Sequence, residues 1–133
     1  MTNLVNYRIY GENHSQPIYI LHGIFGMLDN WHLVAQKLSE NYRVVTFDAR
    51  NHGKSFHDVD ASYSAMIQDL RELMIHLGDA SGIIMGHSMG GGSSFLAGQN
   101  NTGITTMVTY AAANTNPSSI TASRNVTVPN LII

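Results

Sequence analysis

Strand-like and helix-like segments alternate along this 133-residue chain, and the alternation constrains its fold more than any other feature. Short runs rich in β-branched residues predict strands, and apolar residues spaced three and four apart predict helices. Strands that alternate with helices pair in parallel and carry helices on both faces of the sheet. The predicted strands are 5–10, 17–21, 43–47, 82–85, 104–111 and 128–133, and the predicted helices are 31–38, 63–77 and 89–98. We therefore expect one α/β domain over residues 1–133, with a mostly parallel sheet.

Two of the predicted helices carry signals for their ends. Asp29 or Asn30 stands where a side chain could cap the first helix, because both residue types accept hydrogen bonds from free N–H groups. Gly78 follows the second helix, and a glycine there can adopt the left-handed conformation that ends many helices.

Gly86-His87-Ser88-Met89-Gly90 follows the predicted strand 82–85 directly. A G-x-S-x-G sequence between a strand and a helix forms a sharp turn that lifts a serine hydroxyl out of the sheet. Glycines are needed on both sides, because neighbouring backbone passes close to the turn. This arrangement is typical of a serine that attacks an acyl carbon, and it makes Ser88 the candidate nucleophile.

A second motif, His22-Gly23-Ile24-Phe25-Gly26, follows an earlier strand. A third, Asp48 to Ser55, follows the next one. All three motifs fall at the carboxyl ends of strands, where open α/β sheets place their sites. Acyl transfer needs backbone N–H groups aimed at the oxygen that becomes negative. Ile24 or Phe25 would supply one of these groups, and Met89, the residue after the serine, would supply the other.

These motifs resemble those of the α/β-hydrolase superfamily. Residues 17–91, with H-G-I-F-G-x-x-D-N-W, F-D-A-R-N-H-G-x-S and G-H-S-M-G-G, look like small bacterial and mitochondrial esterases of that fold. Residues 86–133, with G-H-S-M-G-G-G-S-S and V-T-V-P-N-L-I, look more like the dienelactone-hydrolase and polyester-hydrolase branch. The resemblance implies a carboxylic ester or thioester substrate, and no cofactor or metal.

The resemblance also implies an acid and a histidine base that follow the serine in the chain. All nine carboxylates lie at or before Asp79, and the last histidine is His87. We interpret the sequence as truncated or chimeric, and ordinary divergence within the superfamily is the alternative. Of the histidines present, His22 lies near the site and is expected to hold its loop, whereas the His87 side chain is expected to point away from the serine.

The composition excludes several other classes of protein. Without cysteine there is no disulfide or thiolate metal site, and a net charge of −2 gives no basic surface for nucleic acid. No apolar run is long enough to span a membrane, and the N-terminus lacks a signal peptide, so a soluble cytoplasmic protein is expected. Two functions remain open. One is a serine ester hydrolase with little activity as this chain alone. The other is a catalytically incomplete domain that binds a partner or associates with itself through an exposed edge at 128–133.

Overall fold

The structure of the chain is a computed structural model that describes residues 3–90, 93–94, 103–110 and 130–132. Its strands are β1 (Tyr7–Tyr10), β2 (Pro17–Leu21), β3 (Arg43–Phe47), β4 (Gly82–His87), β5 (Ile104–Tyr110) and β6 (Asn130–Ile132). Its helices are α1 (His32–Leu38), which follows a 3₁₀ turn η1 (Leu28–Trp31), and α2 (Tyr63–His76). Each of the six predicted strands is present. β2 and β3 have the predicted bounds, and the ends of the other four differ from the predicted ones by at most two residues. The two earlier helices are also confirmed.

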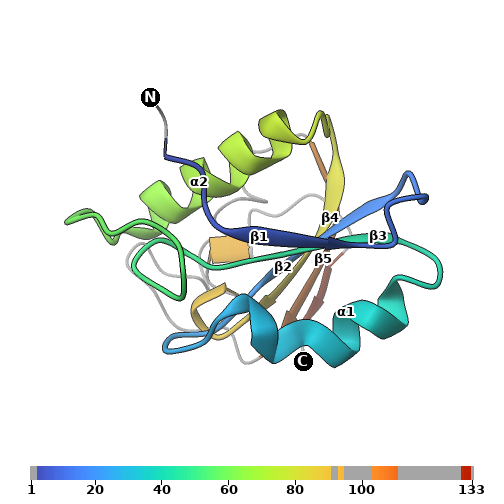
Figure 1. The fold of residues 1–133 in the computed structure, drawn as a ribbon, viewed down its shortest axis with the longest axis horizontal. Coiled ribbons are helices and arrows are strands. Elements are labelled where there is room, and N and C mark those ends of the chain that lie inside the picture. The colour runs from blue at the N-terminus through green and yellow to red at the C-terminus, as the bar shows by residue number, and fades with distance from the viewer. Residues whose placement is uncertain (1–2, 91–92, 95–102, 111–129, 133) are drawn as a thin grey trace.

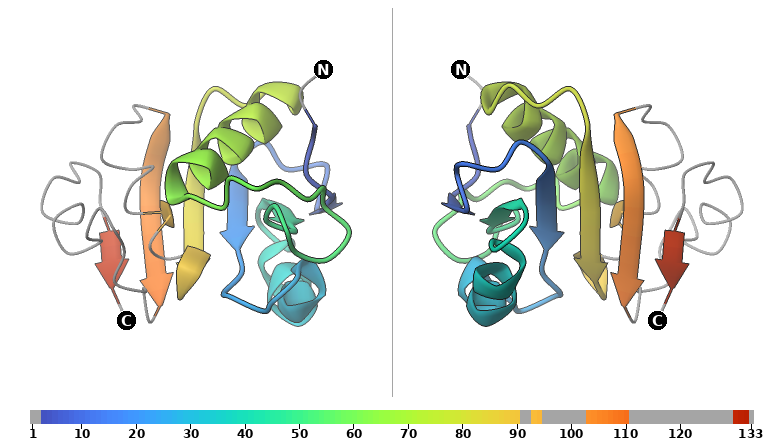
Figure 2. Two further views of the ribbon diagram at one scale, coloured as in Figure 1. Left: turned by 90° about the vertical axis from the view of Figure 1, so that its left-hand side faces the viewer. Right: turned by 90° about the vertical axis from the view of Figure 1, so that its right-hand side faces the viewer.

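In the described part of the chain the strands form one six-stranded sheet, in the order β1-β3-β2-β4-β5-β6. The β1 strand runs antiparallel to β3, and every other pair is parallel. Figure 2 shows β2, β4, β5 and β6 side by side with their arrows pointing the same way. This is the mostly parallel sheet that the alternating sequence predicts, with one antiparallel strand at its edge.

The two helices cover opposite faces of the sheet, with α2 above the strands and α1 below them in Figure 1. Alternate residues of each strand point to opposite faces, so a strand covered on both faces is apolar throughout. In β2, Tyr19 and Leu21 pack with α2, and Ile18 and Ile20 pack on the α1 side. All five β2 residues are buried. The centre of the sheet therefore has a core on each face.

The α2 helix begins at the predicted residue and ends one residue before the predicted end. The Ser62 hydroxyl accepts a hydrogen bond from the Ala65 N–H at 3.2 Å and caps the first turn. The last helical residue is His76, and Gly78 follows with a φ of 76°. That conformation is left-handed and suits glycine, which has no Cβ to clash. Leu70, Leu73 and Met74 on this helix are buried.

The predicted cap of the first helix is wrong. The residue before α1 is Trp31, and no side chain caps the helix there. Asp29 and Asn30 lie one turn earlier, inside η1. The Asn30 side chain instead accepts a hydrogen bond from the Met27 N–H at 2.8 Å, and Asp29 pairs with Arg8. Both residues accept hydrogen bonds as their chemistry suggests, but the extra 3₁₀ turn shifts them off the α1 terminus.

Candidate active site

Two of the three motifs meet because β2 and β4 are neighbours in the sheet. The strands are parallel, and Leu21 pairs with Gly86 in their register. The segment that follows β2 and the segment that follows β4 therefore leave the sheet side by side. This brings the H-G-I-F-G loop next to the G-H-S-M-G turn, as the sequence predicts.

The turn after β4 holds Ser88 in a strained conformation. Ser88 has a φ of 53°, in the left-handed region that residues with a Cβ rarely adopt. Met89 and Gly90 are already helical, so the chain changes from strand to helix within two residues. Of the predicted helix 89–98, residues 93 and 94 are also helical, and the remainder lies outside the described residues.

The glycines of the turn are required by close packing. A Cβ on Gly86 would collide with the carbonyl oxygen of Gly90 and the hydroxyl oxygen of Ser94. A Cβ on Gly90 would collide with the carbonyl oxygen of Leu21 in β2. The new helix therefore crosses the ends of β2 and β4 at a distance that no side chain permits, which is the physical reason for glycine at both positions.

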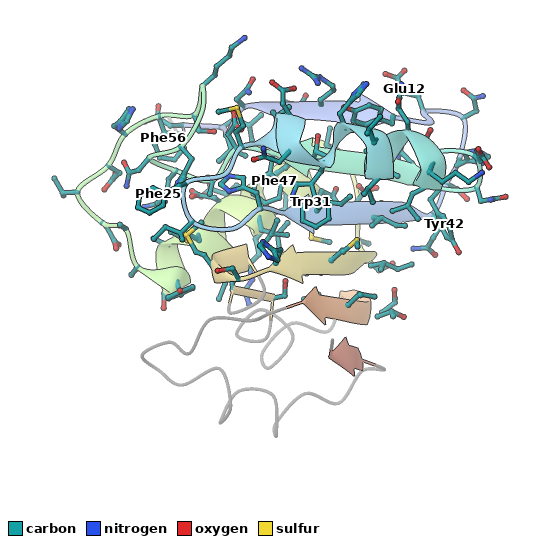
Figure 3. The ribbon with its side chains drawn as sticks, turned by 90° about the horizontal axis from the view of Figure 1, so that it is seen from below. Glu12, Phe25, Trp31, Tyr42, Phe47 and Phe56 are labelled. Atoms are coloured by element: carbon teal, nitrogen blue, oxygen red, sulfur yellow. The ribbon has the colours of Figure 1, made fainter. Side chains whose placement is uncertain are left out.

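The loop after β2 forms a tight turn beside Ser88. The Gly26 N–H donates to the Gly23 carbonyl at 2.9 Å, and Phe25 within this turn has a φ of 61°. Gly23 lies against the serine turn, since a Cβ there would come within 3.2 Å of the Ser88 Cβ. Ile24 and Phe25 are 60% and 91% exposed. Figure 3 shows Phe25 and Phe56 at one end of the molecule and Glu12 and Tyr42 at the other.

His22 is buried and both of its ring nitrogens are engaged. Its Nδ1 lies 2.7 Å from the Gly23 carbonyl, and its Nε2 lies 3.0 Å from the Ala49 N–H. Because a backbone N–H can only donate, Nε2 accepts and Nδ1 carries the proton. Burial lowers the pKa of His22, and the His52 ring 5.0 Å away acts in the same direction. The neutral ring therefore ties the loop after β2 to the loop after β3.

Asp48, the residue after β3, connects the start of η1 to the loop after β3 and to the segment before β1. Its carboxylate accepts hydrogen bonds from the backbone N–H groups of Leu28 at 2.7 Å and Lys54 at 2.9 Å, and from the Asn6 side chain at 2.8 Å. Burial alone would raise the pKa of this carboxyl, but the hydrogen bonds outweigh it and hold the pKa below its ordinary value. Asp48 thus stays ionised and anchors the chain just after the H-G-I-F-G loop.

The Arg50 guanidinium fixes the loop after β3 to α2. It donates to both carboxylate oxygens of Asp69, each at 2.7 Å, and to the Asp60 carbonyl at 2.8 Å. It also lies 5.4 Å from the centre of the Phe56 ring. Arg50 therefore joins the loop after β3 to α2 through Asp69.

A cleft of about 460 Å³ opens beside Ser88. The H-G-I-F-G loop and the serine turn form part of its lining, and Asn30, Trp31 and Val34 complete the described lining. His87 also lies on this wall, with its ring 6.3 Å from the Trp31 ring in an edge-on contact. His87 and Ser88 both line this cleft, and the expected direction of the His87 side chain, away from the serine, stays a prediction.

The structure thus places the predicted residues Ser88, Gly23, Ile24 and Phe25 on one cleft. Met89 follows Ser88 directly, and its side chain is buried outside the described lining of this cleft. His52 stays in the loop after β3, where its Nδ1 faces the Arg50 carbonyl at 3.0 Å. The contribution of Trp31 and Val34 was missed. The signal for Trp31 is the D-N-W sequence that follows the H-G-I-F-G loop, which predicts the start of a helix and belongs to the resemblance to small esterases.

No group of three or more His, Cys, Asp or Glu side chains among the described residues is arranged to hold a metal ion. None of the helices described has both the length and the apolar character to cross a membrane.

Comparison with known proteins identifies the class to which this fold and site belong. Residues 16–129 match the family model of the alpha/beta hydrolase fold, so the chain is a member of that family. It is 44% identical over 88 residues to the sn-1-specific diacylglycerol lipase ABHD11 of Mus musculus, covering 65% of this chain and 29% of that protein. It is 38% identical over 80 residues to esterase YbfF of Escherichia coli, covering 60% of this chain and 32% of that protein.

A solved structure shows the same likeness in three dimensions. A marine microorganism esterase superposes with a TM-score of 0.79 at 34% identity, over 82% of this chain and 42% of the esterase. The chain thus spans about a third of the length of the curated relatives it matches. The likeness to small esterases expected from residues 17–91 agrees with these matches, and the second likeness, over residues 86–133, stays a prediction.

Proposed function

We propose that this chain carries the nucleophile and the oxyanion-binding groups of a serine ester hydrolase. The observation that carries the proposal is the position of Ser88. It is held at a φ of 53° between β4 and a helix, on the wall of a cleft whose other side is the H-G-I-F-G loop. Strained residues of this kind cluster at active sites, because the surrounding structure must stabilise them.

The chemistry would be acyl transfer to the serine. Ser88 Oγ attacks the carbonyl carbon of a carboxylic ester or thioester, and the carbonyl oxygen becomes negative. The N–H of Met89 and that of Ile24 or Phe25 would donate to this oxygen. The alcohol or thiol leaves with a proton, and water then releases the acyl group from Ser88. The names of the relatives, which are esterases and a lipase, support an ester substrate.

The acid and the histidine base that follow the serine in this family have no counterpart among these 133 residues. In this family the acid and the histidine follow the serine, whereas the chain has no carboxylate after Asp79 and no histidine after His87. His22 is a poor substitute, because its two ring nitrogens already bond to Gly23 and Ala49. Binding and an oxyanion hole alone leave about 10³–10⁴-fold acceleration over water. We expect the chain by itself to hydrolyse p-nitrophenyl acetate no faster than that.

Covalent trapping tests the nucleophile directly. The protein is incubated with a fluorophosphonate, with and without added imidazole as an external base, and the adduct is mapped by peptide mass spectrometry. We expect a slow adduct on Ser88 that imidazole accelerates. Ser88→Ala should abolish it. Ser64→Ala, which removes an exposed hydroxyl from α2, should leave it unchanged.

Two results would count against the proposal. Labelling of other serines at the same rate as Ser88 would show that Ser88 is not activated by its surroundings. A fast p-nitrophenyl acetate turnover that depends on Ser88 would show that a base is present among these residues. The alternative of a partner-binding or self-associating domain stays a prediction, and β6 lies at an edge of the described sheet as that prediction requires.

A further inference from the structure

The cleft beside Ser88 has an uncharged lining. None of the described lining residues is Asp, Glu, Lys or Arg. Two of its polar side chains are engaged within the protein, since Asn30 accepts from the Met27 N–H and His22 bridges Gly23 and Ala49. A charged ligand group placed here would lose water without gaining a partner of opposite charge, which is costly.

The wall on the α1 side of the cleft is apolar. Trp31 ends η1 and Val34 lies one turn along α1, so both side chains reach the cleft from the same stretch of helix. Ile24 and Phe25 line it from the loop after β2. Ile24, Phe25 and Val34 remain 60%, 91% and 38% exposed, so they have apolar surface to bury against a ligand. The volume of about 460 Å³ lies within the range of small-molecule sites, roughly 300–1,000 Å³.

We propose that this wall, formed by Trp31, Val34, Ile24 and Phe25, is an acyl-chain site that selects uncharged aliphatic acyl groups of medium length. The inference rests on the proposed function, because Ser88 on the lining of the cleft would determine where the ester carbonyl lies. The chain of the acyl group then extends along Trp31 toward Val34. Transfer of its methylene groups out of water provides the affinity, and the uncharged lining rejects dicarboxylic half-esters.

Trp31 provides a readout that does not require turnover, since it is the single tryptophan of the chain and lines the cleft. Its fluorescence is titrated in the Ser88→Ala protein with methyl butanoate, methyl hexanoate and methyl octanoate, and with monomethyl succinate as the charged probe. We expect the affinity to rise by up to about fourfold for each methylene buried. Monomethyl succinate should bind more weakly than methyl butanoate.

A matched pair of variants on α1 locates the site. Val34→Asp places a charge on the proposed wall and should weaken methyl octanoate binding by at least about tenfold, because the carboxylate cannot be desolvated cheaply. Leu33→Asp is the control, since Leu33 is 77% exposed on the same helix and is not among the described cleft residues. Circular dichroism confirms that both variants fold.

The outcomes separate this inference from the proposed function. Equal binding of the three methyl esters, or equal effects of Val34→Asp and Leu33→Asp, would overturn the acyl-chain site even if Ser88 is labelled normally. Graded binding with no Ser88 adduct would instead overturn the nucleophile and leave an apolar binding site.

Discussion

Ser88 adopts a left-handed backbone conformation that lowers the stability of the folded protein. A left-handed conformation costs a residue with a Cβ roughly 1–2 kcal/mol, and glycine would adopt it freely. Gly86 and Gly90 on either side relieve steric collisions, but the central residue keeps its side chain. The strained conformation places the Ser88 residue at the cleft wall, beyond the end of β4.

Ser88→Gly should therefore stabilise the protein. Relief of the strain, less the greater backbone entropy of glycine in the unfolded chain, leaves a gain of about 0.5–1 kcal/mol in the free energy of unfolding. Ser88→Ala keeps the Cβ and should bring no comparable gain. Urea unfolding of the three proteins measures the difference. Equal stability of the glycine and alanine variants would show that the backbone of this turn is not strained.

The elements around the site are held together by polar contacts that cross between loops. In the loop after β3, the Ala49 N–H donates a hydrogen bond to His22. Arg50 in the same loop donates to the Asp69 carboxylate on α2. The side chains of Arg50 and Asp69 are only 10% and 5% exposed. The H-G-I-F-G loop is therefore linked to α2 through a series of hydrogen bonds, of which the Arg50–Asp69 pair is buried.

Asp69→Leu should be among the most damaging substitutions in this region. It leaves the Arg50 charge buried without its partner, which costs about 3–5 kcal/mol in the free energy of unfolding. The double variant Arg50→Met/Asp69→Leu removes both charges and should recover most of that loss. The exposed pair of Lys37 and Glu40 is the control, and Glu40→Ala there should cost less than about 1 kcal/mol. Urea unfolding is the measurement, and a double variant as unstable as Asp69→Leu would contradict a charge-based explanation.

The stability of the whole molecule should fall in mildly acidic solution because of His22. Burial lowers the pKa of His22 in the folded protein, so below its ordinary value near 6.5 the unfolded chain binds more protons than the folded one. Its contribution is complete above pH 6.5 and is lost as the pH falls toward the lowered pKa. Asp48, whose pKa is also lowered, loses its contribution only below about pH 4.

The measurement is the free energy of unfolding in urea at pH 7.5 and pH 5.5. We expect a decrease at pH 5.5 in the original protein and a smaller decrease in His22→Gln, which cannot take up the proton. An equal decrease in both proteins would show that other groups cause the acid sensitivity.

Much of this architecture could be predicted from local sequence. The strands, the α2 helix and its Gly78 stop follow from apolar spacing and turn chemistry, which act within a few residues. The pairing of strands could not be predicted in the same way. The chain passes from β1 to β2 through a turn-rich segment, yet β3 lies between them and pairs with both. That choice depends on contacts between residues far apart in the sequence.

The sequence by itself determined that Ser88 follows a buried strand, because the motif and the strand are contiguous. It also determined that glycines stand on both sides of the turn. Only the tertiary structure decided how closely the neighbouring loop packs on that serine turn and which helix side chains line the cleft beside it. The neighbouring position of β2 and β4 brings Gly23 to the turn, and the 3₁₀ turn before α1 brings Trp31 and His87 together on the cleft wall. These contacts join segments more than 50 residues apart, and they depend on strand order and helix register, which no short sequence pattern encodes.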